Sequence, residues 1–274
     1  MNERIPFLSK RLAMVTGLIP DEGQVKLAEV GCDHAYCSIY LAKKHLVKTA
    51  LAMDVRPGPL SAAQANINEY GAAGLVKVRL SDGLEKISPG EADTAMLAGM
   101  GGDLIIKILS DYLKTVGNNA GANGSGIITG FVLQPQSHIC EVRKFLKKKG
   151  FKIIQEAMCI DGGKYYTAMY AGYDAAGCVQ LDDDGYDDDG YADGHNDAMF
   201  NVYDGELYDN YGKILLERKD AVLKAYISHE HEITKNIIKS LTGKVDVKSK
   251  AYINQKHKYD MEERALSVLG PDCL

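Results

Sequence analysis

The sequence lacks a long apolar run, since no stretch of its 274 residues approaches the roughly 20 apolar residues of a membrane-spanning helix. Its first residues also lack the pattern of a secretory signal peptide. We therefore expect a cytoplasmic protein with no membrane partner. With 46% hydrophobic residues, the chain can bury a full core, and its length leaves room for one large domain and a smaller one.

The sequence also lacks the usual signatures of metal sites. It has no Cys-x-x-Cys pair, and the closest cysteines, Cys32 and Cys37, have no His or Cys partners at metal-binding spacing. Residues 182–191 repeat Asp-Asp-Asp-Gly-Tyr, but no register matches a calcium-binding EF-hand loop. We expect no metal and reduced thiols throughout. The six cysteines are Cys32, Cys37, Cys140, Cys159, Cys178 and Cys273.

Basic residues are absent from residues 174–209, which hold twelve Asp and Glu and no Lys or Arg. Because the whole chain has a net charge of −5, the remainder carries −5 + 12 = +7. We expect residues 173–210 to form a disordered or loosely folded acidic insertion. A mildly basic body is compatible with nucleic acid binding but does not require it.

A single glycine, Gly31, stands where a pyrophosphate-binding loop would have three. It follows the apolar run 25–28 and precedes the helix-like segment 38–44. A strand that turns on glycine into a helix brings backbone N–H groups to the place where nucleotide-type cofactors bind in doubly wound α/β folds. One close approach suits S-adenosylmethionine (SAM), which has no phosphates between adenosine and its reactive end, better than NAD.

Apolar runs alternate with helix-like segments from residue 25 to about 172, which predicts an α/β fold with a mostly parallel sheet. Only residues 161–163 separate the last two runs, so these should form an antiparallel hairpin. This Rossmann-like arrangement is typical of class I methyltransferases. The expected strands are 25–30, 49–54, 75–80, 93–98, 127–134, 151–159 and 165–171, and the expected helices are 34–46, 57–70, 101–116 and 137–149.

The pattern changes after residue 212. Apolar residues recur at helical spacing, a break follows at residues 242–244, and Tyr252, Tyr259 and Leu266 then come at intervals of seven. We expect two amphipathic helices packed as an antiparallel hairpin. Residues 211–264 hold twelve Lys and Arg against eight Asp and Glu. Two interpretations remain open, a solvated helical hairpin and a basic arm for RNA phosphates.

Carboxylates follow the second and third expected strands. Asp54 can accept hydrogen bonds from both ribose hydroxyls of an adenosine, and Asp82 can receive its adenine amino group, with Gly83 leaving room for the ring. The alternatives are a helix N-cap or solvated strand end for Asp54, and an Asx turn for Asp82. Both carboxylates are expected on the same sheet edge as the turn at Gly31.

The fourth expected strand runs into Ala98-Gly99-Met100-Gly101-Gly102-Asp103, directly before a helix. Three glycines there allow a ligand to approach the backbone closely, although tight helix packing is an alternative. The Asn/Asp-Pro-Pro-Tyr/Phe motif of many amino-methylating enzymes is missing, which favours a different acceptor atom. After the fifth strand, Gln134 offers a donor and an acceptor to a base edge, and Pro135 stiffens the turn.

Six motifs together resemble the bacterial tRNA (adenine-22-N1)-methyltransferase family (TrmK), over roughly residues 5–172. The resemblance implies a SAM-dependent Rossmann-like domain, a helical coiled-coil domain, and methylation of adenine N1 in tRNA. Three positions depart from the family, which usually has Ser at Cys32, Glu at Asp54 and Asn at Gln136. The acidic repeat is also foreign to it. The motifs are Ser9-Lys10-Arg11-Leu12, Gly31-x-Asp33-His34-Ala35-Tyr36, Gly58-Pro59-Leu60, Asp82-Gly83-Leu84, Ala98-Gly99-Met100-Gly101-Gly102 and Leu133-Gln134-Pro135.

Adenine N1 is a usable nucleophile when it is unpaired, so methyl transfer depends mainly on positioning. Asp33 or His34 could remove a proton from the methylated base, His34 could instead orient it, and Tyr36 could stack on it or line the SAM pocket. The alternatives are a class I methyltransferase for another RNA base or a small molecule, and a SAM- or RNA-binding module without catalysis.

The sequence thus predicts three segments and a set of candidate residues. The segments are a SAM-binding methyltransferase domain (1–172), an acidic linker (173–210) and a helical coiled-coil domain (211–274), in a monomer that acts on tRNA. The candidates for chemistry are Asp33, His34, Tyr36 and Gly101; those for cofactor binding are Gly31, Asp33, His34, Asp54, Asp82, Gly83, Ala98, Gly99, Met100 and Gly101; those for substrate binding are Gly102, Gln134 and Pro135.

Overall fold

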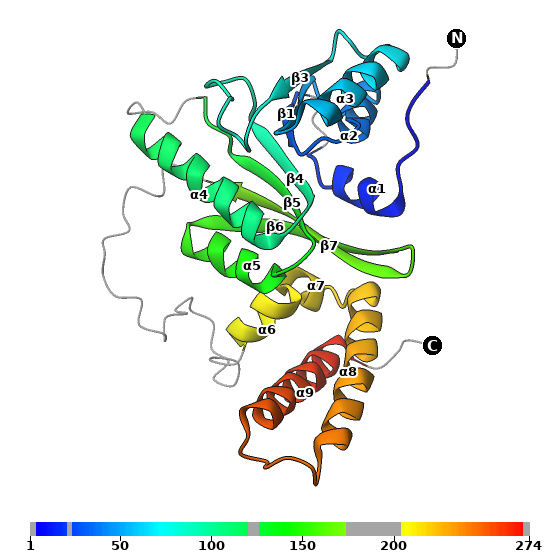
Figure 1. The fold of residues 1–274 in the computed structure, drawn as a ribbon, viewed down its shortest axis with the longest axis vertical. Helices are drawn as coiled ribbons and strands as arrows, with labels where there is room; N and C mark the ends of the chain where they lie inside the picture. Colours follow the sequence, from blue (N-terminus) through cyan, green and yellow to red (C-terminus); the bar gives the residue numbers. More distant parts are fainter. Residues whose placement is uncertain (1–3, 21–23, 120–125, 174–203, 271–274) are drawn as a thin grey trace. The chain divides into compact units, whose positions relative to one another are not determined.

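The computed structural model describes residues 4–20, 24–119, 126–173 and 204–270 (Figure 1). The chain divides into two compact units, one within residues 1–183 and the other within residues 184–274. The acidic repeat at 182–191 lies outside the described residues, as do Cys178 and Cys273. None of the described helices combines the length and apolar character needed to cross a bilayer.

The first unit contains a seven-stranded sheet in the order β3-β2-β1-β4-β5-β7-β6. The first five strands in this order are parallel, and β7 runs antiparallel to both of its neighbours. The predicted sheet and its terminal antiparallel hairpin are therefore confirmed. The strands are β1 (Lys26–Val30), β2 (Thr49–Asp54), β3 (Val76–Leu80), β4 (Thr94–Met100), β5 (Gly130–Pro135), β6 (Phe151–Asp161) and β7 (Lys164–Tyr173).

Helices cover both faces of this sheet because successive strand residues point to opposite sides. Leu27 packs in a cluster with Ile39 and Ile67 from α2 and α3, whereas the next residue, Ala28, packs in a second cluster with Leu109 of α4 and Leu146 of α5. The four helices between strands are as predicted, but α1 was not predicted. The helices are α1 (Lys10–Thr16), α2 (Tyr36–Lys43), α3 (Pro57–Glu69), α4 (Gly102–Asn119) and α5 (Ile139–Lys148).

The strand register aligns the carboxyl ends of the parallel strands at one edge. Val30 at the end of β1 pairs with Met53, and Asp54 at the end of β2 pairs with Leu80 at the end of β3. The order reverses between β1 and β4, because the chain moves from β1 to β2 and β3 on one side and later to β4 and β5 on the other. Ligands of open α/β sheets bind at this type of switch point.

Two long-range contacts tie the end of the sheet to helices. Arg143 on α5 donates from Nε to Glu156 Oε1 on β6 at 2.9 Å, and both side chains are at least 96% buried, with exposures of 4% and 1%. At the far end of β6, Asp161 Oδ2 accepts the backbone N–H of Arg11 at 3.0 Å. The hairpin therefore anchors α1, which Ser9 caps by accepting from Leu12 N–H.

The second unit is helical, and its α8 and α9 pack against each other as predicted (Figure 1). Residues 242–249 separate them, a longer connection than the predicted break. Helices α6 and α7 were not predicted, and α6 begins inside the segment expected to be an acidic linker. Its residue Leu207 is buried. The helices are α6 (Asp204–Tyr211), α7 (Lys213–Glu217), α8 (Ala221–Leu241) and α9 (Lys250–Leu269).

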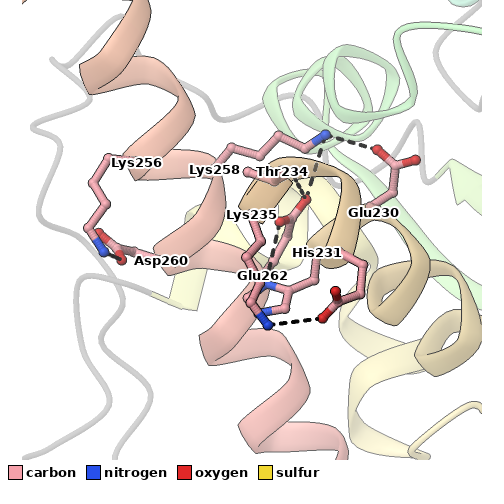
Figure 2. Close-up of polar contacts among 9 residues, drawn as sticks. Glu230, His231, Thr234, Lys235, Lys256, Lys258, Asp260 and Glu262 are labelled. Carbon is pink, nitrogen blue, oxygen red and sulfur yellow. Dashed lines mark hydrogen bonds and ion pairs between the residues drawn. The ribbon is translucent and has the colours of Figure 1, made fainter. Parts of the chain in front are cut away.

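A polar group lies in the contact between α8 and α9 (Figure 2). Glu262 is only 1% exposed, and its Oε1 accepts a hydrogen bond from Thr234 Oγ1 at 3.2 Å. Lys258 Nζ lies 3.6 Å from the same carboxylate, and His231 Nδ1 lies 3.6 Å from its other oxygen. Burial raises the pKa of Glu262 above its ordinary value. A slip between the helices would separate this carboxylate from its partners, so the polar group disfavours other registers.

Apolar residues predicted for the helix contact divide into two groups. Leu223 and Ile227 are buried as expected. Ile233 and Ile237 are 41% and 37% exposed, because α8 turns its polar residue Thr234 toward α9. The hydrophobic pattern therefore predicted the helices correctly, but not all of the residues that lie in the contact between them.

Candidate functional site

A cleft opens where the strand order reverses, between the end of β1 and the end of β4. The enclosed part of this cleft has a volume of about 220 Å³. Residues from α1 and from the start of α2 complete its wall. The lining residues are Arg11, Leu12, Glu29, Val30, Gly31, Cys32, Asp33, His34, Tyr36, Cys37, Ala98 and Gly99.

The turn after β1 adopts left-handed backbone at three of five positions. Gly31 has φ +70°, Asp33 has φ +48° and Ala35 has φ +58°. Gly31 also approaches another loop closely, since a Cβ there would lie 3.3 Å from Met100 Cε. Left-handed conformation at a non-glycine residue costs on the order of 1–2 kcal/mol, so the fold holds this turn in a strained shape.

Sequence reasoning assigned no role to two charged residues of the cleft, although one lies just before a quoted motif and the other within one. The first is Glu29, an acid within an otherwise apolar strand. It is 7% exposed, and its Oε2 accepts hydrogen bonds from the backbone N–H and the hydroxyl of Ser38. Burial raises the pKa of Glu29 from 4.5 to about 7, even though the bonds from Ser38 act in the opposite direction.

The raised pKa makes the stability of the protein depend on pH. An unfolded chain releases the Glu29 proton near pH 4.5, whereas the folded protein holds it until about pH 7. The stabilising effect of the bound proton is complete below pH 4.5 and declines between these values. Glu29→Gln mimics the protonated acid at every pH. We therefore expect the free energy of unfolding of this variant, measured relative to the wild type, to rise by about 2–4 kcal/mol between pH 4 and pH 8. Urea unfolding of both proteins at the two pH values measures this, and parallel pH dependences would contradict it.

The second missed residue is Arg11, in the Ser9-Lys10-Arg11-Leu12 motif. Its Nη1 donates to Gln134 Oε1 at 3.0 Å, and its guanidinium lies 5.7 Å from the centre of the Tyr166 ring. A Cβ on Gly99 would come within 3.3 Å of Arg11 Nη1. This glycine, with φ +76°, therefore lets the guanidinium reach the cleft wall.

Gln134 was predicted to face a base edge, but the structure encloses it completely. Its Oε1 accepts from Arg11, from the backbone N–H of Gly99 at 3.1 Å and from Gln136 Nε2 at 3.0 Å. Its Nε2 donates to the carbonyl of the next residue, Pro135, which is also buried. In this structure Gln134 orients the cleft wall and does not itself face the cleft.

Asp33, His34 and Tyr36 all line the cleft, as the motif suggested. His34 Nε2 lies 3.8 Å from Asp33 Oδ2, and the His34 and Tyr36 rings stack with centroids 5.4 Å apart. The backbone carbonyl of His34 accepts from Asn66 Nδ2 of α3 at 3.0 Å. The turn therefore presents an acid, an imidazole and an aromatic face together.

The two predicted adenosine-binding carboxylates lie at the ends of neighbouring strands but not in the cleft wall itself. Asp54 is 6% exposed, and its Oδ1 accepts the backbone N–H of Arg56 at 2.9 Å. Asp82 is exposed and borders a separate shallow hollow with Gly83. On the side where a Cβ would project, Gly83 packs against α4, because a Cβ there would lie 2.9 Å from Ile108.

The glycine-rich segment from the end of β4 to the start of α4 contacts two different parts of the protein. Ala98 and Gly99 line the cleft. Met100, Gly101 and Gly102 instead lie against the loop that follows β5: the Met100 carbonyl accepts from the backbone N–H of Gln136 at 2.9 Å, and Gly102 N–H donates to the Ser137 carbonyl at 3.1 Å. The predicted close approach is therefore real, but at Gly102 its partner is protein backbone.

Two of the residues that line the cleft, Cys32 and Cys37, are cysteines. Among the described residues, no group of three or more His, Cys, Asp or Glu side chains could hold a metal ion. Cys32 and Cys37 are free thiols, and burial raises the pKa of both above its usual range, so they stay protonated near neutral pH.

Comparisons with known proteins place this geometry in context. The family model described as "Methyltransferase domain" matches residues 8–169. The tRNA (adenine(22)-N(1))-methyltransferase of Bacillus subtilis is 36% identical over 167 residues, which cover 60% of this chain and 64% of that protein. The match thus spans less than two thirds of the relative's length. It confirms the family resemblance found in the motifs.

Solved structures share the fold over nearly the whole chain. The B. subtilis m1A22 tRNA methyltransferase TrmK is 26% identical, with a TM-score of 0.66, and the comparison covers 96% of this chain and 97% of that one. M. capricolum TrmK, solved with S-adenosylhomocysteine, is 20% identical with a TM-score of 0.70, covering 96% and 100% of the two chains. The second likeness concerns the fold alone.

Proposed function

The chain belongs to the methyltransferase-domain family, and on this premise we propose that it transfers a methyl group from SAM to N1 of an adenine in tRNA, at position 22 by likeness to its B. subtilis relative. One observation carries the proposal. The cleft at the switch point joins the strained turn of Gly31 to Gly99 near the end of β4, with carboxylates at the ends of β2 and β3.

The charges of the cleft fit SAM. Its methionine part carries a carboxylate and an ammonium group, and the cleft offers the Arg11 guanidinium together with the Glu29 and Asp33 carboxyls. Asp54 ends β2 and Asp82 follows β3, on one side of the switch point, where they would hold the ribose and the adenine. When bound, SAM supplies the methyl group, with its carbon–sulfur bond breaking as the bond to adenine N1 forms.

This assignment predicts a cost for removing either carboxylate. We expect Asp54→Ala and Asp82→Ala each to weaken SAM binding by about 1–3 kcal/mol, since a charged hydrogen-bond partner is lost. Calorimetric titration measures the affinity. Asp260→Ala, which removes an exposed carboxylate of α9, is the matched control and should bind SAM normally. Unchanged affinity in both variants of the sheet edge would refute their role.

The residues of the turn after β1 act on the acceptor side of the cleft. Asp33 and His34 can orient the target base or take its proton, and the Tyr36 ring offers a stacking surface. In-line methyl transfer needs little beyond positioning, and the strained but firmly bonded turn provides it. Because Watson–Crick pairing blocks N1, the target adenine must be unpaired when it enters.

The second unit supplies a basic surface suited to tRNA phosphates. Residues 239–250, around the connection between α8 and α9, contain four exposed lysines and one acid, Asp246, and so carry a charge of +3. The lysines are Lys239, Lys244, Lys248 and Lys250. Such a cluster favours polyanion binding by releasing counterions. This observation supports RNA over a small molecule as the acceptor.

Mapping the methylated nucleoside tests the function directly. The protein is incubated with labelled SAM and unmodified tRNA, the tRNA is digested, and the modified nucleoside and its position are identified. N1-methyladenosine at position 22 is expected. Label at another base would support the alternative of a different RNA acceptor, and no transfer despite SAM binding would support a non-catalytic module.

A further inference from the structure

Two polar residues outside the cleft wall pair across the loops that follow β4 and β5. His138 Nδ1 lies 2.9 Å from Asp103 Oδ2. Asp103 is in the first turn of α4, directly after the glycine-rich segment, and His138 directly precedes α5. Their side chains are 76% and 55% exposed, so the imidazole is fixed at one nitrogen and open to solvent elsewhere.

The backbone of His138 is held in an unfavourable conformation. It is left-handed, with φ 51° and ψ 42°, which for a non-glycine residue persists only where the surroundings enforce it. Here the enforcing contacts come from the glycine-rich segment: Met100 and Gly102 bond to Gln136 and Ser137, the two residues just before His138. The imidazole is therefore presented at a defined place beside that segment.

The strand order indicates whether His138 and Asp103 lie nearer to the cofactor or to the acceptor. Asp54 and Asp82, the proposed adenosine ligands, follow β2 and β3 on one side of β1, whereas Asp103 and His138 follow β4 and β5 on the other side. A group beyond Gly99 on the β4–β5 side is thus remote from the adenosine of the cofactor. An acceptor that entered from the β4–β5 side would meet it.

The pair also defines a hydrogen-bonding pattern. A carboxylate only accepts, so Asp103 selects the tautomer in which Nδ1 carries the proton and Nε2 has a free lone pair. An acceptor of this kind matches the 6-amino group of adenine, which donates, and opposes the O6 atom of guanine, which accepts. A hydrogen bond to the 6-amino group also leaves the neighbouring N1 lone pair free to react.

We propose that His138, positioned by Asp103, accepts a hydrogen bond from the 6-amino group of the target base and so selects adenine. The assignment rests on the proposed adenine N1 methylation, and it adds a base-reading residue on the loop after β5. Asp103 acts here as a positioning residue, because it touches only the imidazole.

The test uses tRNA carrying either adenine or purine at the mapped target position, since purine keeps N1 but lacks the 6-amino group. The wild type should methylate purine about tenfold more slowly than adenine. His138→Asn, chosen because asparagine tolerates left-handed backbone, should methylate adenine about tenfold more slowly and show no further loss with purine. Asp103→Ala should also reduce the preference for adenine over purine. SAM affinity should be unchanged in both variants.

His45→Asn is the matched control. His45 is also an exposed histidine with left-handed backbone, with φ 58°, but it follows the C-terminus of α2 and is not part of the loops after β4 and β5. It should keep the full preference for adenine. If His138→Asn retains the wild-type preference while turnover falls, the pair only ties two loops together and the proposal is wrong. If the wild type methylates no adenine N1 in tRNA, the proposed function itself fails, and the base-reading role fails with it.

Discussion

Replacing Glu156 with alanine should lower the free energy of unfolding by about 3–5 kcal/mol, because it leaves the Arg143 guanidinium charged inside the protein without its carboxylate. The two side chains join α5 to β6 at 2.9 Å with almost no exposure. Their individual charges are costly to bury, so the loss of one partner is worse than the loss of the pair.

Urea unfolding of the single and double variants measures this effect. The double variant Arg143→Met with Glu156→Leu should recover much of the loss, since it removes both charges and keeps the volume. Asp260→Ala breaks an ion pair whose side chains are both 50% exposed and should change stability by less than about 1 kcal/mol. A cost for Glu156→Ala as small as that of Asp260→Ala would show that the pair is not enclosed as described.

Gly102→Ala should reduce turnover by about a hundredfold or more. Its Cβ would lie 2.4 Å from the Ser137 carbonyl oxygen and 2.9 Å from that of His138, and backbone atoms cannot move aside as a flexible side chain can. The loops after β4 and β5 would have to separate by roughly 1 Å, and a misplacement of this size is enough for such a loss in a reaction that depends on positioning.

Single-turnover kinetics at saturating SAM separate this effect from a loss of cofactor affinity. Gly74→Ala is the matched control, since nothing lies within 4 Å of the added Cβ, and it should behave as the wild type. Normal turnover in Gly102→Ala would mean that the contact between the two loops is unimportant for catalysis. The largest steric requirement falls on Gly102 and not on Gly101, where the nearest atom is 3.4 Å away.

Local patterns were enough to predict the sheet, because alternating apolar runs and helical segments are properties of neighbouring residues. They also placed Asp33, His34 and Tyr36 in one turn, and the structure shows these side chains in one cleft. The order of the strands was not predicted, since it depends on which strands pair and not on any single segment. The roles of the individual site residues stay predictions until the variants are measured.

The parts that escaped prediction depend on distant contacts. Helix α1 has only seven residues and is held by Asp161, which lies 150 positions away in the sequence. Gln134 was interpreted as a base-reading residue because its amide offers a donor and an acceptor, yet these groups are bonded within the protein, to Arg11 and Gly99 among others. Likewise, no helical periodicity places Thr234 and Glu262 in the contact between α8 and α9. Such residues are recognised only when the partner is known.

The bond between Arg11 and Asp161 has a consequence for the order in which the protein matures on the ribosome. The helix that carries Arg11 is among the first segments synthesised, but its anchor is made 150 residues later. At typical rates of translation, this interval is on the order of 10–30 s. A nascent chain therefore cannot complete the cleft until the hairpin of β6 and β7 has emerged and paired, so truncated products lack a finished cleft even though they contain every residue of the Gly31 turn.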